Sequence, residues 1–321
     1  MKGLYPGFTF GKATRDAYGD TLRDLGREHP DIVVLDADLA KSTKSATFGE
    51  AFPDRFINVG IQEANLVGMA GGMATSGMTP FISSFAAFVI LKGFDQLRMA
   101  VSYPRLNVKV IGSHGGISIG EDGASQQSVE DVALACALPH FVVCVPSDEH
   151  QMRAVVRAAY EHDGPVYIRS GRPKAPLVYD ATPVDFAFGR ATRVREGTDL
   201  TIIANGLMVA AALVAAETLA GEGINARVVD MATVKPLDEE EVRLAAVETG
   251  AIVVAEEHLI HGGLGARVAQ AVCRLHPCRV EFVGLDDTYA ESGDPEALMR
   301  KYGLTAGAVA AAARRVSTAR V

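Results

Sequence analysis

The chain repeats one hydrophobic pattern, in which a short run of aliphatic residues precedes a longer stretch with apolar residues three and four positions apart. Short apolar runs are typical of buried strands, and the longer spacing is typical of helices that cover a sheet. In the first half the pattern predicts strands at Ile32–Leu35, Asn107–Ile111, Phe141–Val145 and Val166–Arg169. It predicts helices at Thr14–Arg27, Gln62–Ser76, Phe88–Val101, Ser128–Ala137 and Glu149–His162.

The pattern lapses between Arg172 and Gly189, where prolines occur without periodicity, and then resumes. The second half predicts strands at Leu200–Ala204, Ala226–Asp230, Ala251–Glu256 and near Val280–Val283, and helices at Met208–Leu219, Glu239–Thr249, Leu264–Arg274 and Leu304–Arg315. Alternating strands and helices favour parallel sheets with helices on both faces. We therefore expect an α/β fold of two doubly wound domains: a mainly parallel sheet domain at 1–175, a linker at 176–190, and a smaller α/β domain at 191–321.

Composition narrows the class of protein. The 321 residues include 31 Lys+Arg and 39 Asp+Glu, a formal charge of −8, and 48% are hydrophobic, as in ordinary globular proteins. The acidic balance argues against a nucleic-acid partner, and the apolar stretches are too short to span a membrane. Four cysteines do not form a disulfide framework, and no secretory signal is visible, so we expect a cytoplasmic protein with reduced thiols.

Nucleotide-binding loops are missing from the sequence. No Gly-x-Gly-x-x-Gly follows the first predicted strand, and no Gly-x-x-x-x-Gly-Lys-Ser/Thr occurs. Candidate chemistry lies instead in three clusters. The first follows a strand and contains Asp36, Asp38 and Leu39, with Ser42 close behind. Polar residues at the carboxyl end of a parallel strand bind ligands in open α/β sheets, but the two acids could equally cap the next helix.

The second cluster contains Glu63, which begins an apolar, glycine-rich helical stretch. A carboxylate in a first helical turn is commonplace because it complements the helix dipole, and composition alone favours that structural role. A Glu in so apolar a setting would otherwise be paired or functionally poised.

The third cluster is a long glycine-rich loop over residues 111–127, which carries His114 and the acids Glu121 and Asp122. Loops of this length inside a compact domain are usually functional, so here a functional role is favoured.

Four motifs occur in order in the first half: Ala-Asp-Leu at 37–39, Gly-Ile-x-Glu at 60–63, Ser-Phe-x-x-Phe at 84–88 and Gly-Glu-Asp-Gly at 120–123. Together they resemble the pyrimidine-binding domain of transketolase, a thiamine-diphosphate enzyme. Glu-Glu-His at 256–258 and Gly-Gly-Leu-Gly at 262–265 resemble the C-terminal domain that follows it in the same family. The resemblance covers nearly the whole chain and implies a first domain that binds the pyrimidine of the cofactor.

Transketolases are about twice this length and begin with a diphosphate-binding domain, marked by Gly-Asp-Gly and a downstream Asn. This sequence has no such stretch. The resemblance therefore implies the C-terminal subunit of a split transketolase, inactive alone, with no metal ligand of its own. A separate N-terminal subunit would hold the diphosphate and Mg²⁺ or Ca²⁺, and two copies of each subunit would assemble as α2β2.

The resemblance also assigns cofactor contacts. Glu63 would exchange a proton with N1′ of the aminopyrimidine and so activate the cofactor, aided by an apolar pocket. Phe85 and Phe88 would sandwich the pyrimidine, although residues three apart could also share a helix face and pack in a core. Leu39 would hold the cofactor in its bent shape, with Asp38 near the thiazolium.

Substrate contacts follow in the same way. Arg15, Ser42, His114 and Arg172 fall where transketolases hold a sugar phosphate, although Arg15 could be a surface residue and Arg169 lies close to Arg172. Asp122 matches the acid that contacts the sugar's α-hydroxyl, so the resemblance makes Glu63, His114 and Asp122 the catalytic candidates.

One position departs from the family. Gln126 stands where transketolases have a His that contacts the donor, and an amide cannot carry a proton at neutral pH. This leaves an altered donor open. The leading hypothesis is transfer of a two-carbon ketol unit from a ketose phosphate to an aldose. The alternatives are a β subunit of a 2-oxo-acid dehydrogenase or acyloin-forming enzyme, a half chain like 1-deoxyxylulose-5-phosphate synthase, and a non-catalytic scaffold.

Overall fold

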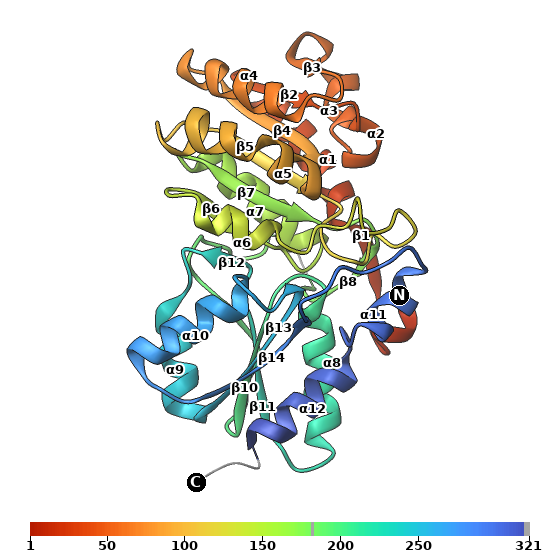
Figure 1. Ribbon diagram of the computed structural model, residues 1–321, viewed down its shortest axis with the longest axis vertical. Coiled ribbons are helices and arrows are strands. Elements are labelled where there is room, and N and C mark those ends of the chain that lie inside the picture. Colours follow the sequence, from red (N-terminus) through yellow and green to blue (C-terminus); the bar gives the residue numbers. More distant parts are fainter. Residues whose placement is uncertain (181–182, 318–321) are drawn as a thin grey trace.

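The computed structural model describes residues 1–180 and 183–317 and consists of two α/β halves stacked end to end, each built around its own sheet (Figure 1). The α/β fold class predicted from the alternating pattern is confirmed, and both sheets are mainly parallel. Within the described residues, no helix is both long enough and apolar enough to cross a membrane.

The sheet of the first half has seven strands in the order β12-β6-β7-β5-β4-β2-β3. All neighbouring pairs are parallel except β12–β6. Its strands are β2 (Ile32–Asp36), β3 (Phe56–Asn58), β4 (Thr79–Phe85), β5 (Lys109–Ser113), β6 (Val142–Cys144), β7 (Val166–Ser170) and β12 (Thr233–Lys235).

Helices cover both faces of this sheet because each presents an apolar stripe to it. Tyr18 and Met152 represent the core on one face, and Leu66 and Ile90 represent the core on the other. The helices are α1 (Thr14–Glu28), α2 (Ala40–Thr43), α3 (Ala46–Ala51), α4 (Glu63–Thr75), α5 (Ala86–Gln96), α6 (Asp131–Ala137), α7 (Glu149–Glu161), the 3₁₀ turn η2 (Pro53–Arg55) and the π-helical turn η3 (Leu97–Ser102). A further 3₁₀ turn, η1 (Lys2–Leu4), precedes β1 and packs against the second half.

The sheet of the second half has five strands in the order β14-β13-β10-β11-β9, of which only β9 is antiparallel to its neighbour among the described strands. Its elements are β9 (Thr192–Arg195), β10 (Leu200–Ala204), α8 (Met208–Ala220), β11 (Ala226–Asp230), α9 (Glu239–Thr249), β13 (Ala251–Leu259), α10 (Leu264–Leu275), β14 (Arg279–Leu285), α11 (Pro295–Lys301) and α12 (Ala306–Ser317).

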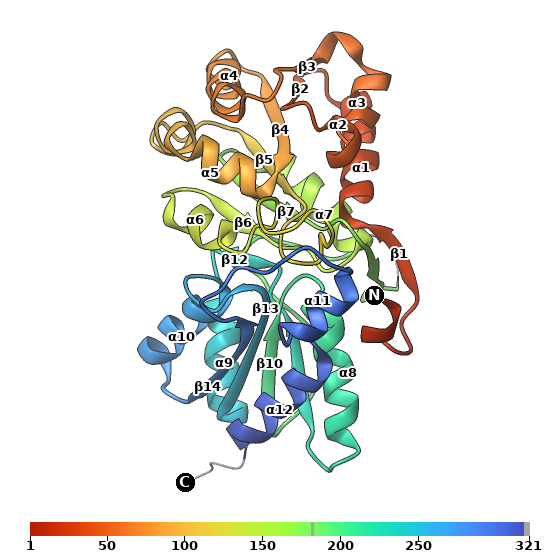
Figure 2. The same cartoon turned by 45° about the vertical axis from the view of Figure 1, so that its right-hand side comes forward.

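The two halves are tied together by backbone as well as by side chains. Strand β12 comes from the second half of the chain, yet it pairs with β6 and completes the first sheet. A two-stranded ribbon of β1 (Phe10–Ala13) and β8 (Lys174–Pro176) joins the start of α1 to the segment after β7. The N-terminal turn η1 lies beside α11 of the second half (Figure 2), where the amino group of Met1 pairs with Glu296. The carboxyl edge of the second sheet faces the first half of the molecule, since Asp230 at the end of β11 accepts hydrogen bonds from Ser147 and Gln151.

The structure differs from the predicted elements chiefly at β4, a central strand that the hydrophobic pattern missed. All of its residues are buried, but Pro80, Ser83 and Ser84 interrupt its apolar run. Pro80 is tolerated because it lies one residue before the pairing with β5 begins at Phe81. Ser83 is satisfied by a 2.8 Å hydrogen bond with the hydroxyl of Tyr18.

Two predicted helices also have different limits. The helix expected from Ser128 begins at Asp131, because Ser128 instead bridges to Gly115 and Gly116 at the base of the glycine-rich loop. The helix expected at Phe88–Val101 begins at Ala86 and changes to a π-helical turn after Gln96. Phe85 consequently ends a strand rather than sharing a helix face with Phe88.

Candidate functional site

The predicted site residues come together at one edge of the first sheet. Strands β7, β5, β4 and β2 are neighbours and parallel, so their carboxyl ends meet, and each is followed directly by a predicted residue or cluster. Arg172 follows β7, His114 follows β5, Phe85 ends β4, and Asp38 follows β2. This edge is where open α/β sheets bind ligands.

Glu63 occupies the first position of α4, after a turn in which Gly60 has a φ of 74°. The amide of Gly60 donates a 2.9 Å hydrogen bond to Oδ1 of Asn58, which fixes the approach of the chain to the helix. The side chain of Glu63 is 2% exposed, and its Oε1 accepts a long 3.3 Å hydrogen bond from Oγ of Ser84. The carboxylate is therefore buried and weakly hydrogen-bonded.

An array of three rings lies beside this acid. The rings of Phe85 and Phe88 are stacked with centroids 5.6 Å apart and planes 16° apart. The ring of Phe85 also stacks on the imidazole of His114, with centroids 4.0 Å apart. This second contact follows from the sheet register, in which Phe85 is paired with Ser113. The array offers flat aromatic surface next to a carboxylate.

His114 is held as a neutral imidazole. Nη1 of Arg15 lies 2.9 Å from His114 Nε2, and because a guanidinium can only donate, Nε2 must accept. The proton then lies on Nδ1, which donates to Oγ of Ser113 at 2.7 Å. Burial, followed by the charges of Arg15, Arg172 and Lys44, lowers the pKa of His114 to about 3. The backbone of His114 has a φ of 61°, in the left-handed region.

Two arginines approach the same place from different elements. Arg15 is half-buried in the first turn of α1, and its Nη1 also donates to the backbone oxygen of Ser42 at 3.0 Å. Arg172 is half-buried after β7, and its Nη1 donates to the backbone oxygen of Ile119 and to Oε2 of Glu121, each at 2.6 Å. Together they form an anion-attracting region that can hold a phosphate or a similar group.

Arg169, the other arginine near this end of β7, has a structural role. Arg169 is buried within β7, where its Nη2 lies 3.1 Å from Oδ1 of Asp131. Arg172 is thus the arginine of this pair that stands at the mouth of the site. Asp122 is exposed on the same loop, and Gln126 is half-buried, with its Oε1 accepting a hydrogen bond from Oγ of Ser125.

The two acids after β2 have different surroundings. Asp36 is buried, and its carboxylate accepts hydrogen bonds from the amide of Leu39 at 2.6 Å and from the hydroxyls of Thr43 and Ser45. It therefore organises the following turn, but neither acid caps the next helix, whose N-cap residue is Leu39 and which has no side-chain cap. Asp38 is exposed, and its Oδ1 accepts a 2.9 Å hydrogen bond from Nδ2 of Asn58. Leu39, the next residue, is half-buried.

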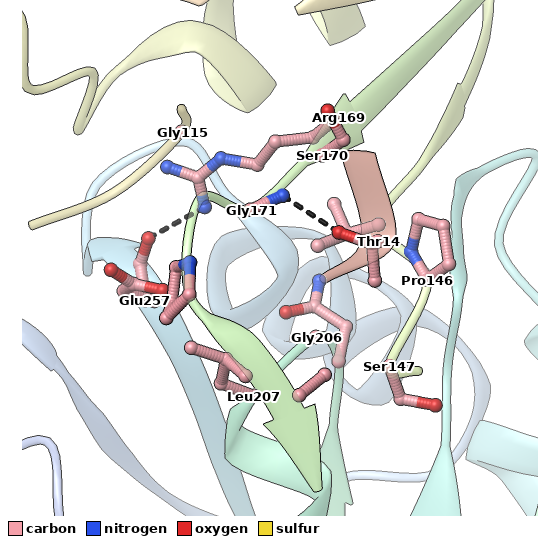
Figure 3. Close-up of a pocket in the computed structure, with 14 residues that line it drawn as sticks. Thr14, Gly115, Pro146, Ser147, Arg169, Ser170, Gly171, Gly206, Leu207 and Glu257 are labelled. Carbon is pink, nitrogen blue, oxygen red and sulfur yellow. Dashed lines mark hydrogen bonds between the residues drawn. The ribbon is translucent and has the colours of Figure 1, made fainter. Parts of the chain in front are cut away.

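A small cavity backs the anion-attracting region (Figure 3). Its lining includes Thr14, Gly115 and Gly171, the direct neighbours of Arg15, His114 and Arg172 in the chain, together with Glu257 from the second half. Its volume, about 30 Å³, is enough for one or two water molecules. The amide of Gly171 donates to Oγ1 of Thr14 at 2.8 Å, which joins two sides of this wall.

Glu257 is the second half's contribution to the loop that carries His114 and Asp122. Its Oε1 accepts a 2.6 Å hydrogen bond from the amide of Ser118, and its backbone oxygen accepts one from Arg169. Burial raises the pKa of Glu257, opposed by the charge of Arg169. Ser292 holds the far end of the loop by donating to the backbone oxygen of Glu121.

Three residues that the sequence reasoning did not assign adjoin the site: Ser84, Lys92 and Glu257. Lys92 could have been found, because it lies four residues after Phe88 and so on the same face of α5. The contacts of Glu257 and Ser84 depend on how strands are ordered, and no local signal in the chain carries that order. Among the described residues, no group of three His, Cys, Asp or Glu side chains is arranged to hold a metal ion.

Two family models match the chain. Residues 11–177 match the transketolase, pyrimidine binding domain, and residues 189–309 match the transketolase, C-terminal domain. A solved structure described as a split gene transketolase, inactive β4 tetramer, superposes with a TM-score of 0.91 at 50% sequence identity. The match covers 97% of this chain and 100% of that one.

Two curated relatives extend the comparison. A 6-deoxy-6-sulfo-D-fructose transketolase subunit of Clostridium sp. (strain MSTE9) is 42% identical over 303 residues, which is 94% of each chain. Transketolase of Homo sapiens is 39% identical over 310 residues, which is 95% of this chain but 49% of the human protein. The region is therefore shared by relatives of about this chain's length and by relatives of about twice that length.

Proposed function

The chain belongs to the transketolase family, and we propose that it is the C-terminal subunit of a two-subunit transketolase. In this proposal it transfers a two-carbon ketol unit from a ketose phosphate to an aldose only in complex with an N-terminal subunit. Residues 1–175 bind the pyrimidine of thiamine diphosphate and residues 191–321 form the C-terminal domain, with the linker at 176–190. The observation that carries the proposal is the buried Glu63 carboxylate beside the stacked rings of Phe85 and Phe88.

The residues present fit an aminopyrimidine. A heteroaromatic ring needs a flat apolar surface, which Phe85 and Phe88 offer, and its ring nitrogen needs a proton-sharing partner, which Glu63 offers. When bound, thiamine diphosphate supplies the nucleophilic carbon for two-carbon transfer. Glu63 holds and moves the proton at N1′, and Leu39 and Asp38 flank the cofactor.

The anion-attracting region supports a substrate with a terminal phosphate or sulfonate. Arg15 and Arg172 supply charge, while Ser42 and the neutral His114 supply hydrogen-bonding groups. Asp122 contacts the sugar hydroxyls. Gln126, which stands where the family has a His, sets which ketose is the preferred donor.

We assign the diphosphate and its Mg²⁺ or Ca²⁺ to the N-terminal subunit, and we propose an α2β2 assembly. A broad apolar surface on α4, α5 and η3 supports association with other chains. Within the described residues, five of the eight exposed large apolar side chains lie on these elements or within three residues of their ends: Ile61, Met78, Leu91, Met99 and Tyr103. Clustered apolar exposure of this kind marks protein interfaces.

The test is reconstitution. The purified chain is mixed with its N-terminal partner, thiamine diphosphate and Mg²⁺, and transfer from xylulose 5-phosphate to ribose 5-phosphate is measured. We expect turnover by the mixture and none by either chain alone. Activity of this chain alone would refute the two-subunit proposal. Consumption of pyruvate with an artificial electron acceptor, without ketol transfer, would favour the 2-oxo-acid dehydrogenase alternative.

Donor choice is tested with the same mixture. Xylulose 5-phosphate, fructose 6-phosphate and 6-deoxy-6-sulfofructose differ in chain length and terminal anion, so their kcat/KM values rank the donors. The variant Gln126→His restores the family's side chain and should raise kcat/KM for xylulose 5-phosphate relative to the other donors.

A further inference from the structure

Lys92 reaches from α5 into the space between Glu63 and Phe88. Its Nζ lies 3.7 Å from Oε2 of Glu63 and 4.3 Å from the centroid of the Phe88 ring. The Lys92 side chain is 52% exposed, whereas that of Glu63 is 2% exposed. A half-exposed cation is therefore paired with a buried acid.

The pairing of Lys92 with Glu63 matters because Glu63 has few other partners. Its Oε1 accepts the long 3.3 Å bond from Ser84, and its Oε2 faces Lys92. Within the described chain, Lys92 is the cation that comes within 4 Å of this carboxylate. Its ammonium group also lies over the face of Phe88, where the ring quadrupole attracts a cation. Lys92 thus engages both the acid and the aromatic surface.

An aminopyrimidine would use the same two groups. Its ring would lie on the aromatic surface, and its protonated ring nitrogen would donate to the carboxylate. The ammonium group and the heterocycle cannot occupy the space between Glu63 and Phe88 at the same time. Since Lys92 has a long, flexible and half-exposed side chain, it can turn outward to solvent without disturbing the core.

Building on the proposed function, we propose that Lys92 is a competing cation that sets the affinity of the site for the cofactor's aminopyrimidine. Cofactor binding displaces the ammonium group from Glu63 and Phe88. The displaced interactions are a half-exposed ion pair and a cation–π contact, each modest in water. Removing them should therefore tighten aminopyrimidine binding about three- to tenfold.

The experiment uses the full chain and 4-amino-5-hydroxymethyl-2-methylpyrimidine, which carries the aminopyrimidine without the thiazolium or diphosphate. Binding is followed by NMR for wild type, Lys92→Met, Lys92→Arg and Glu63→Gln. The matched control is Lys12→Met, because Lys12 is 53% exposed and is also ion-paired, with Asp20, but lies on β1.

We expect Lys92→Met to bind the pyrimidine about three- to tenfold tighter than wild type, while Lys92→Arg binds no tighter and Lys12→Met is unchanged. Raising NaCl should strengthen binding by wild type, since salt screens the competing pair, and should leave Lys92→Met unchanged. Equal or weaker binding by Lys92→Met would overturn the competition.

Glu63→Gln distinguishes a failure of the Lys92 proposal from a failure of the proposed function. If Glu63→Gln weakens pyrimidine binding while Lys92→Met binds no tighter than wild type, the proposed function is supported and the role of Lys92 is refuted. If Glu63→Gln binds as wild type does, the proposed role of Glu63 itself fails. An absence of binding by every variant at saturating ligand would overturn both.

Discussion

The carboxyl edges of the two sheets carry similar residues and have different surroundings. At the first edge, Glu63 and His114 are buried, but Arg172 beside them is half-buried, and Asp38 and Asp122 are exposed to solvent. At the second edge, Asp230 ends β11 and Glu257 lies near the end of β13, and both are buried against the first half of the molecule. The same topological position thus carries the candidate site in one sheet and the contact with the other half in the second.

Hydrogen bonding shows the difference most clearly. Oδ2 of Asp230 accepts from Ser147, Gln151 and Tyr179, all within 3.0 Å. The Glu63 carboxylate, by contrast, accepts one long hydrogen bond among the described residues. Three donors from the protein thus hold one oxygen of Asp230, although its Oδ1 has no hydrogen-bond partner among the described residues. A buried acid held by several protein donors stabilises the fold, whereas one with few donors is available to a ligand.

The largest expected effect tests the first edge. Glu63→Gln should reduce ketol transfer by the reconstituted complex about 10²- to 10⁴-fold, because an amide cannot exchange the proton. Steady-state rates measure the loss, and gel filtration checks that the complex still assembles. Ser84→Ala, which removes the long hydrogen bond, should cost much less. Unchanged turnover in Glu63→Gln would favour the scaffold alternative.

Next comes the acid at the second edge. Glu257→Ala should lower the free energy of unfolding by about 2–3 kcal/mol. The reason is that the amide of Ser118 loses its hydrogen-bond acceptor and the guanidinium of Arg169 loses a nearby negative charge. Urea denaturation measures this. Glu222→Ala, which breaks a solvent-exposed pair with Arg314, should leave the stability nearly unchanged. Equal losses in the two variants would erase the contrast between buried and surface acids.

Arg172→Ala should act on binding rather than on stability. We expect KM for the ketose phosphate to rise about 10- to 50-fold with a smaller change in kcat, because one charged anchor of the terminal anion is lost. Arg172→Lys should recover part of the loss. A fall in kcat with KM unchanged would contradict a role in anion binding.

The smallest effect concerns pH. Burial raises the pKa of Asp230 to about 7, so the native protein keeps this proton between about pH 4 and 7, where the unfolded chain has lost it. Stability from this group therefore falls as pH rises through that window. Asp230→Asn mimics the protonated acid, so the stability that it gains relative to wild type should be larger at pH 8 than at pH 5.

Unfolding by urea at the two pH values checks this expectation. The difference between wild type and Asp230→Asn isolates the group from other titrating residues. A variant that is less stable than wild type at pH 8 would show that Asp230 is ionised and well paired in the native protein.

Much of the site could be predicted from the chain, because the predicted residues directly follow apolar strands or begin helices, and local pattern reveals those places. His114 was singled out in this way, whereas the roles of Glu63 and Phe85 were assigned by motif resemblance, since composition alone favoured a structural role for Glu63. Strand β4 was missed because two buried serines and a proline hide its apolar character. Its serines are tolerated inside the sheet by the hydroxyl of Tyr18 and the carboxylate of Glu63, which are distant in sequence.

The sequence by itself determined the α/β class, the family and the candidate site residues, since these depend on periodicity and on short motifs. The tertiary structure decided how those residues are used. It made Arg169 a buried partner of Asp131 and left Arg172 at the mouth, made His114 an acceptor for Arg15, and brought Lys92 to Glu63. These outcomes depend on which strands are neighbours and which groups lose contact with water, and such long-range distances are fixed only when the chain has folded.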